Sequence, residues 1–154
     1  MGAKVKNPRK KFLWSIMFPK HPINTYLFQS CTLPDIEIDQ VAHGDVNRDV
    51  KTAGRVTIGN LIVEKLMTTE GSDTWLHDWL YACQDHIVGG GLVPSQYWET
   101  AIVNELAEDG VSVLNTHVFE EVWPCKITGL DLDRMASENT IESIEFSVGT
   151  ADKY

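Results

Sequence analysis

The sequence has no apolar run long enough to cross a membrane, and residues 1–11 are basic without the apolar stretch of a secretory signal peptide. We therefore expect a protein that is made and kept in the cytoplasm, with no membrane partner. Cysteine is also scarce: Cys31, Cys83 and Cys125 are odd in number and far apart. This pattern excludes a disulfide framework and a Cys-x-x-Cys metal clip, so we expect three buried thiols.

Basic residues are scarce beyond the N-terminus. The 154 residues include 13 Lys and Arg against 22 Asp and Glu, a formal net charge of −9. Five of the basic residues form a basic arm over residues 1–11: Lys4, Lys6, Arg9, Lys10 and Lys11. The other 8 basic and all 22 acidic residues give the body, 12–154, a net charge of −14. Such a body repels phosphates, which argues against a protein that grips nucleic acid.

Signatures of phosphate and calcium binding are lacking as well. Gly89-Gly90-Gly91 follows a predicted helix instead of opening one, and no Gly-Lys-Ser/Thr accompanies it, which favours a helix end over a phosphate loop. Asp131, Asp133 and Glu142 have calcium-loop spacing. However, residues 135–136 are Met and Ala, where that loop needs an oxygen ligand and a glycine, so we expect a solvated loop.

The five histidines lack the spacing of zinc ligands, and His77 fits the polar face of a helix. No nucleophile elbow is present, although a Ser/His/Asp triad assembled only in three dimensions stays open. The sequence therefore predicts no enzyme, no cofactor and no metal site.

One amphipathic helix is predicted over about 73–86. Ser72 or Asp73 can cap its first turn, and Asp73 places negative charge at the positive end of the helix dipole. Helical spacing gives it one apolar packing face, formed by Trp75, Leu76, Trp79, Leu80 and Cys83. A helix of this length is not stable alone, so this face must pack on an apolar surface.

The segment 54–67 leads into the helix and is predicted to be one long strand. Its apolar residues occupy both parities, with Val56, Ile58, Ile62 and Leu66 on one and Leu61, Val63 and Met67 on the other. Two apolar faces are typical of a strand that is covered on both sides.

The rest of the chain alternates with the period of β-strands. Further strands are predicted over 12–18, 26–33, 35–41, 97–107, 111–123, 125–132 and 140–149. Glu108-Asp109-Gly110 predicts a hairpin turn, and Ile144, Phe146 and Val148 share one face of the closing strand. A polar inter-strand loop is predicted over 42–54, a length that is usually functional or mobile. We expect a single domain over 1–154, mainly β with one helix.

Short stretches along nearly the whole chain resemble the tail tube proteins of contractile-tailed bacteriophages. These stretches are Phe12-Leu13-Trp14, Thr32-Leu33-Pro34 with Asp35 to Gln40, His43-Gly44-Asp45, Lys51 to Arg55, Leu61 to Leu66, Trp75 to Trp79, Val122 to Gly129 and Asn139 to Val148. None of them is a catalytic signature.

The resemblance implies a β-barrel-like sandwich of antiparallel strands with one flanking helix, a subunit of a homohexameric ring. Rings of that family stack into the inner tail tube, a structural virion component through which phage DNA is ejected without specific binding. The implied partners are further copies of the chain and the tail sheath, tape-measure, baseplate and tail terminator proteins, in a tail assembled in the host cytoplasm. Two alternatives stay open: the inner tube of a type VI secretion or extracellular injection system, which passes protein, and a small monomeric enzyme or binding domain.

Two sets of functional residues follow from this reading of the chain. An acidic strand face would keep DNA from sticking to the bore, and the candidates are Asp35, Glu37, Asp39 and Glu145. For any one strand, the alternative is that these acids face outward. The second set would make contacts between rings, where the basic arm meets an acidic body: Lys4, Lys6, Arg9, Lys10 and Lys11, with His43, Asp45, Arg48 and Lys51 of the predicted loop.

Overall fold

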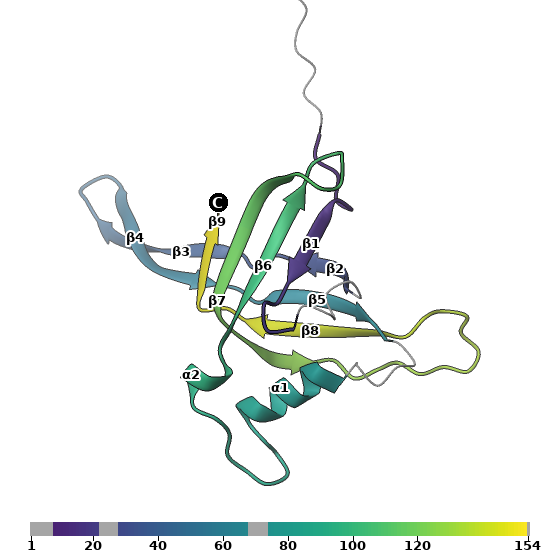
Figure 1. Ribbon diagram of the computed structural model, residues 1–154. Helices are drawn as coiled ribbons and strands as arrows, with labels where there is room; N and C mark the ends of the chain where they lie inside the picture. The colour runs from purple at the N-terminus through teal and green to yellow at the C-terminus, as the bar shows by residue number, and fades with distance from the viewer. Residues whose placement is uncertain (1–7, 22–27, 68–73, 154) are drawn as a thin grey trace, which may run out of the picture.

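The protein is mainly β in the computed structural model, which describes residues 8–21, 28–67 and 74–153 (Figure 1). The elements are β1 (Trp14–Met17), β2 (Phe28–Thr32), β3 (Ile36–Gly44), β4 (Asp49–Ile58), β5 (Leu61–Leu66), α1 (Trp75–Cys83), α2 (Pro94–Tyr97), β6 (Glu99–Leu106), β7 (Val113–Ile127), β8 (Ile141–Ser147) and β9 (Thr150–Lys153). No helix in these three ranges is long and apolar enough to cross a membrane. The predicted class, mainly β with one main flanking helix, is confirmed.

Seven strands form one antiparallel sheet in the order β1-β6-β7-β8-β5-β2, and β9 pairs with β7. Figure 1 shows β1, β6 and β7 crossing β5 and β8 steeply, so the sheet folds over on itself. The long strand β7 joins the two halves, because it pairs first with β6 and then with β8. Glu121 has a φ of 57° at the register shift in the pairing of β7 with β6, shortly before β7 begins to pair with β8 at Trp123, and the strand turns there from one half to the other.

The prediction of two separate strands over 111–123 and 125–132, divided at Pro124, was wrong, because β7 is one strand. Proline has no N–H to donate, but Pro124 lies at a register shift where β7 pairs with β8, and the strand runs through it to Ile127. The structure also adds β9, since the chain turns at 148–149 and returns along β7 from Thr150. The predicted hairpin turn at 108–110 joins β6 to β7 as expected.

An aromatic cluster forms the centre of the core. The ring of Phe18 is fully buried and lies 5.2 Å from Phe146, 5.8 Å from Phe28 and Trp75, and 6.0 Å from Trp79, centroid to centroid. These tilted and edge-on contacts join β1, β2, α1 and β8 into one packed unit. Ile144, Phe146 and Val148 are all buried, which confirms the predicted inner face of the closing strand.

The helix α1 is shorter than predicted, because the backbone is extended at Gln84 (φ −157°, ψ 115°) and the helix ends at Cys83. Trp75, Leu76 and Trp79 are buried, while Leu80 and Cys83 are half-buried. The proposed caps, 72 and 73, lie outside the described residues. The short helix α2 was not predicted, and it includes Tyr97, which was expected to begin a strand. The Tyr97 carbonyl accepts a 2.8 Å hydrogen bond from Trp79 Nε1.

The predicted long strand and the predicted loop 42–54 were both wrong. The chain divides at 59–60 into β4 and β5, and most of 42–54 belongs to β3 and β4, which pair with each other. Only 45–48 remain as a loop. Strand β5 buries Leu61 and Val63, but β4 lies outside the folded sheet. The prediction that both faces of the strand are covered is therefore wrong for β4. Residues 43–51 are mostly polar, which favoured a loop over the hairpin that the structure shows. A strand with both faces in solvent does not need alternating apolar residues.

Candidate assembly surface

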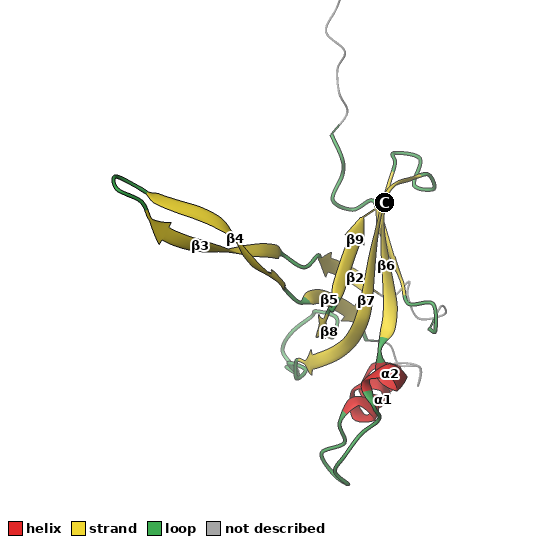
Figure 2. Cartoon of the chain, turned by 90° about the vertical axis from the view of Figure 1, so that its left-hand side faces the viewer, coloured by secondary structure: helices red, strands yellow, loops and turns green. Residues whose placement is uncertain are grey.

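The hairpin β3–β4 projects from the body of the protein in both views (Figures 1 and 2). Its strands pair from Ile36 opposite Ile58 to Gly44 opposite Asp49. The turn is closed by a 2.8 Å hydrogen bond from the Asp45 N–H to the Arg48 carbonyl. Every residue of β3 is exposed. Because an isolated two-stranded hairpin is marginal in water, this one needs a further surface to lie on.

One face of the hairpin carries uncovered apolar side chains. Ile36, Ile38 and Val56 are 61%, 53% and 58% exposed. The register sets Ile38 opposite Val56 and Ile36 opposite Ile58, so these residues share a face near the hairpin's base. We call Ile36, Ile38 and Val56 the apolar face. Neighbouring apolar side chains left in water are typical of a surface that another molecule covers.

The four acidic bore candidates fall into two places. Glu37 and Asp39 are exposed on the hairpin, and Asp35 is exposed just before it. Because side chains alternate along a strand, Glu37 lies on the face opposite Ile36 and Ile38. Glu145 is half-buried on β8, where it accepts a 3.5 Å hydrogen bond from Asn60 Nδ2. The structure thus keeps the stripe 35–39 together but places Glu145 in the main sheet.

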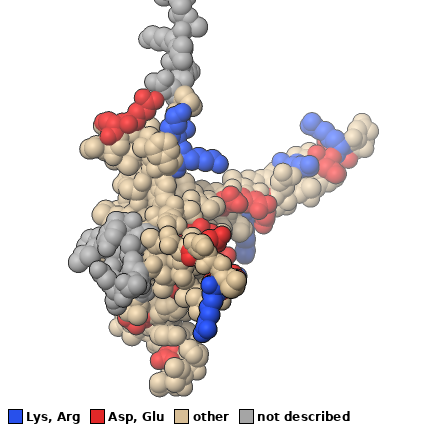
Figure 3. Space-filling model, turned by 90° about the vertical axis from the view of Figure 1, so that its right-hand side faces the viewer, with Lys and Arg blue, Asp and Glu red and all other residues tan. Residues whose placement is uncertain are grey.

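The candidates for contacts between rings are also divided. His43, Asp45, Arg48 and Lys51 gather at the hairpin's tip, where Figure 3 shows both signs of charge, and all four are exposed. The described part of the arm, 8–11, lies elsewhere, at the end of the body near β1 and β6 (Figure 1). Hence the structure brings the four tip residues together but does not place Arg9, Lys10 and Lys11 beside them.

Of the arm, residues 4 and 6 lie outside the described residues, while Arg9, Lys10 and Lys11 are exposed. Arg9 Nη1 lies 3.1 Å from Glu105 Oε2, and His117 Nε2 lies 3.3 Å from the same oxygen. Burial alone would raise the pKa of Glu105, but the His117 hydrogen bond and the Arg9 charge outweigh it and hold the pKa below its usual value. The Arg9 contact attaches the end of the arm that adjoins the body to β6.

Sequence reasoning missed a buried charged cluster beneath α1. Lys65 is fully buried, Glu142 is 2% exposed, and the two are paired in register across β5 and β8. Glu142 Oε2 lies 3.1 Å from His77 Nε2, which ties the helix to the sheet. The alternation of Leu61 and Val63 places position 65 inside, and that of Ile144 and Phe146 does the same for position 142. The alternation of apolar residues thus indicated that both side chains are buried, but charged residues at these positions favoured exposure to solvent.

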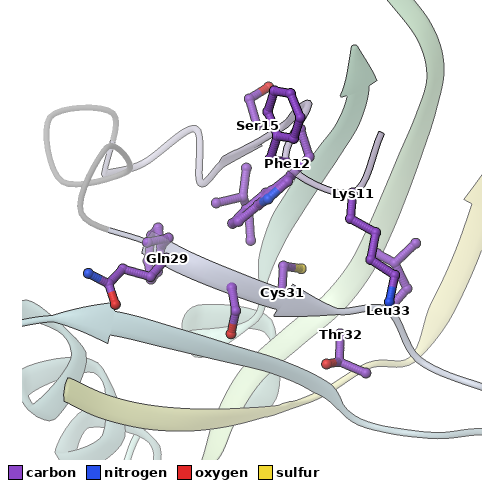
Figure 4. A pocket seen from close by; sticks show the side chains of 11 residues that line it. Lys11, Phe12, Ser15, Gln29, Cys31, Thr32 and Leu33 are labelled. Carbon is purple, nitrogen blue, oxygen red and sulfur yellow. The ribbon is translucent and has the colours of Figure 1, made fainter. Parts of the chain in front are cut away.

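Sequence reasoning also missed a hollow between the two end strands of the sheet, β1 and β2. It has a volume of about 1030 Å³ and is lined by residues of 11–16 and 28–33 (Figure 4). Neither strand pattern alone predicts it, because it depends on where the folded sheet fails to close. In the described ranges, no group of three or more His, Cys, Asp or Glu side chains is placed to hold a metal ion.

The fold is similar to that of proteins from contractile injection machines. A chain of the anti-feeding prophage cap, the AFP tube terminating cap, superposes with a TM-score of 0.82 at 16% identity, covering 100% of this chain and 95% of that one. A chain of the PVC sheath–tube complex, an extracellular contractile injection system in its extended state, gives a TM-score of 0.78 at 17% identity, covering 97% and 93%. At these identities the likeness concerns the fold alone.

Comparison of the amino-acid sequence is more specific than comparison of the fold. Tail tube protein gp19 of Enterobacteria phage T4 is 28% identical over 128 residues, covering 80% of this chain and 77% of that protein. The family model of the T4-like virus tail tube protein gp19 matches residues 10–150, which include the hairpin, the helix α1 and every strand of the folded sheet except most of β9. A match of this extent shows that the chain belongs to the T4-like virus tail tube protein gp19 family.

Proposed function

We propose that copies of this chain form hexameric rings, and that these rings stack into the inner tube of a contractile phage tail, through which DNA is ejected. The observation that carries the proposal is the uncovered apolar face of the hairpin, in a chain that matches a tail tube family over residues 10–150. A surface that a single copy leaves exposed is covered when copies associate, and identical subunits associate most simply by repeating one contact around a ring.

The two faces of the hairpin suit different surroundings in such a tube. The apolar face belongs against protein, which leaves Glu37 and Asp39 on the opposite face in water. We infer that these acids and Asp35 line the bore, with Asp35 at its edge beside the neighbouring copy, and that Glu145 contributes near the hairpin's base. Carboxylates there repel the passing phosphates, whereas Lys or Arg would release counterions on contact and retain the DNA. Replacing Asp35, Glu37 and Asp39 by lysine should give tubes that retain DNA at low salt.

The remaining proposed contacts join rings to each other and to the rest of the tail. The tip residues His43, Asp45, Arg48 and Lys51 and the basic arm meet the next ring, where positive charge faces an acidic body. Sheath, tape-measure, baseplate and terminator proteins are the proposed partners in a virion tail that assembles in the host cytoplasm. A chain that lacks residues 2–10 should fold but stack poorly, measured as tube length by electron microscopy.

Electron microscopy of the purified chain tests the proposal. We expect sixfold rings or tubes in class averages, with an annular particle around a central bore. A mass that stays monomeric at micromolar concentration and does not change with salt would overturn the proposal.

A second candidate function is the inner tube of an injection particle that passes protein. It is favoured by the fold similarity to the AFP and PVC chains, which covers nearly the whole chain. Isolated native particles distinguish the two: particles with a DNA-filled head support the phage tail, and particles that hold protein but no nucleic acid support the injection machine.

A further inference from the structure

The folded sheet is left open between its two end strands. β1 pairs only with β6 and β2 only with β5 among the described residues, so each has one edge without a strand neighbour. The hollow of about 1030 Å³ lies between these edges. We call the two edges with this hollow the seam. Strand edges offer unpaired N–H and C=O groups, which natural proteins cover or pair.

The seam presents apolar side chains to solvent. Phe12 is 76% exposed, and Trp14, Cys31 and Leu33 are half-buried. Figure 4 shows Cys31 pointing from β2 into the space between the strands, while the side chain of Lys11 runs beside Leu33. Lys11 lines the hollow, and Lys10 lines an adjoining cavity that shares Lys11 and Trp14 with it, so the apolar surface has a positive rim.

We propose that the hairpin of a second copy of this chain covers the seam, with its apolar face on Phe12 and with its Asp35 beside Lys11. The inference rests on the proposed function and specifies which two surfaces of neighbouring copies meet. The chain's own hairpin does not do this, because no residue of β3 or β4 lines the hollow.

Charge and chemistry select this occupant. Asp35 lies at the hairpin's base, directly before Ile36 of the apolar face, whereas Lys10 and Lys11 lie at the seam's rim, where the arm joins the body. Opposite charges of this kind steer two surfaces together and fix their register. The hairpin also offers free strand edges and an apolar face, which match the edges and the hollow of the seam.

The contact is heterologous, because each copy presents a hairpin to one neighbour and a seam to the other. Repetition of such a contact closes into a ring when the rotation fits, and otherwise gives a helical filament. With the apolar face on the seam, Glu37 stays on the far side of the hairpin, where the proposed bore needs it.

Disulfide trapping between two singly substituted chains tests this contact. Ser15→Cys places a thiol in the seam, and Val56→Cys places one on the apolar face; both substitutions nearly conserve volume. The native thiols interfere little near pH 8, because burial raises the pKa of Cys31 to about 12, while burial and the charge of Glu99 raise that of Cys83 to about 11. Burial, with the charge of Glu145, also raises the pKa of Cys125.

We expect the oxidised mixture of Ser15→Cys and Val56→Cys chains to yield several times more covalent heterodimer than Ser15→Cys mixed with Thr57→Cys. Residue 57 is the matched control, because it neighbours Val56 on the opposite face of the same strand. Equal yields from the two mixtures, in samples that contain tubes, would overturn the seam contact and leave the tube itself standing. Absence of rings or tubes from the parent chain would overturn both.

If the Val56→Cys chain does not assemble, the unsubstituted chain decides. Tubes grown from a mixture of ¹⁴N and ¹⁵N chains are treated with a carbodiimide, which joins a lysine amine to a carboxylate in direct contact. Mass spectrometry should find Lys11 joined to Asp35 in peptides of mixed isotope. Failure to find this pair, or finding it only within one chain, would contradict the proposal.

Discussion

Strands β8 and β3 have similar sequence patterns and opposite environments. In β8, Ile144 and Phe146 are fully buried against the chain's own α1 and β5. In β3, Ile36 and Ile38 alternate with acids in the same way, yet they are 61% and 53% exposed. Alternation therefore predicts that one face will be covered. It does not say whether the cover comes from the same chain or from another copy.

The two strands differ in what lies opposite them. β8 faces large aromatic side chains, with the Phe146 ring 5.6 Å from Trp79, so the chain fills this space itself. The hairpin faces solvent, because its only strand pairing in the described ranges is internal. We therefore expect changes on β8 to alter folding and changes on the hairpin to alter assembly.

The largest effect should come from the core side of this comparison. Phe146→Ala removes a fully buried ring and should lower the free energy of unfolding by about 3–5 kcal/mol, through lost burial and the cavity left behind. Phe12→Ala is the matched control, since Phe12 is 76% exposed, and it should change that free energy by less than about 0.5 kcal/mol. Urea unfolding of the dissociated subunit measures both. Equal effects would contradict the division between core and seam.

A smaller loss of stability should follow when the contact between α1 and the sheet is removed. His77→Ala leaves the Glu142 carboxylate, 2% exposed, without its His77 partner, which should cost about 1–3 kcal/mol in unfolding free energy. His43→Ala on the exposed hairpin is the control and should leave that free energy unchanged. Thermal unfolding followed by circular dichroism tests the pair, and a His77→Ala melting temperature equal to that of the parent would refute the tie.

The hairpin should show the reverse behaviour. Ile38→Ala should change the unfolding free energy of the isolated subunit by less than about 0.5 kcal/mol, because the side chain is 53% exposed. It should nevertheless reduce assembly strongly, measured by light scattering and electron microscopy at matched concentration. Thr57→Ala, on the opposite face, should assemble like the parent. If Ile38→Ala forms tubes as long as those of the parent, the apolar face does not contribute to assembly.

The smallest effect concerns the turn between β6 and β7. The Ser112 hydroxyl and the N–H groups of Val111 and Ser112 donate to Asp109, which lowers its pKa from the usual 3.8 to about 2. A lowered pKa in the folded state adds stability above the usual value, and this stability is lost as the pH falls toward 2. Carbon-13 NMR of the carboxyl group should show titration near pH 2. Titration near 3.8 would show that the turn does not hold the carboxylate.

Much of the folded sheet could be predicted because its residues obey the period of two. Ile144, Phe146 and Val148, and the hairpin turn at 108–110, needed only local pattern and turn chemistry. Pro124 and Lys65 could not be predicted in this way. Pro124 is tolerated because the register between β7 and β8 shifts there. Lys65 is buried because it lies on the inner face of β5. Both conditions depend on how neighbouring strands pair.

The candidate site was predicted in part. The acidic stripe 35–39 is together and exposed, and the tip residues His43 and Arg48 lie near each other. Residues 42–54 were predicted to be a loop because most of them are polar. A hairpin that no other part of the chain covers can have polar residues along both strands, so this pattern does not distinguish it from a loop. The seam between β1 and β2 depends on the closure of the sheet, which no single segment of sequence encodes.

Hydrogen exchange of the dissociated subunit and of the assembled form tests the central claim most directly. Peptides from β8, residues 141–147, serve as an internal reference, because the chain's own core covers them in both states. We expect peptides from β3 and β4, residues 36–44 and 49–58, to exchange readily in the subunit and to become strongly protected on assembly, while the exchange of β8 does not change. Equal exchange of the hairpin in both states would contradict the claim.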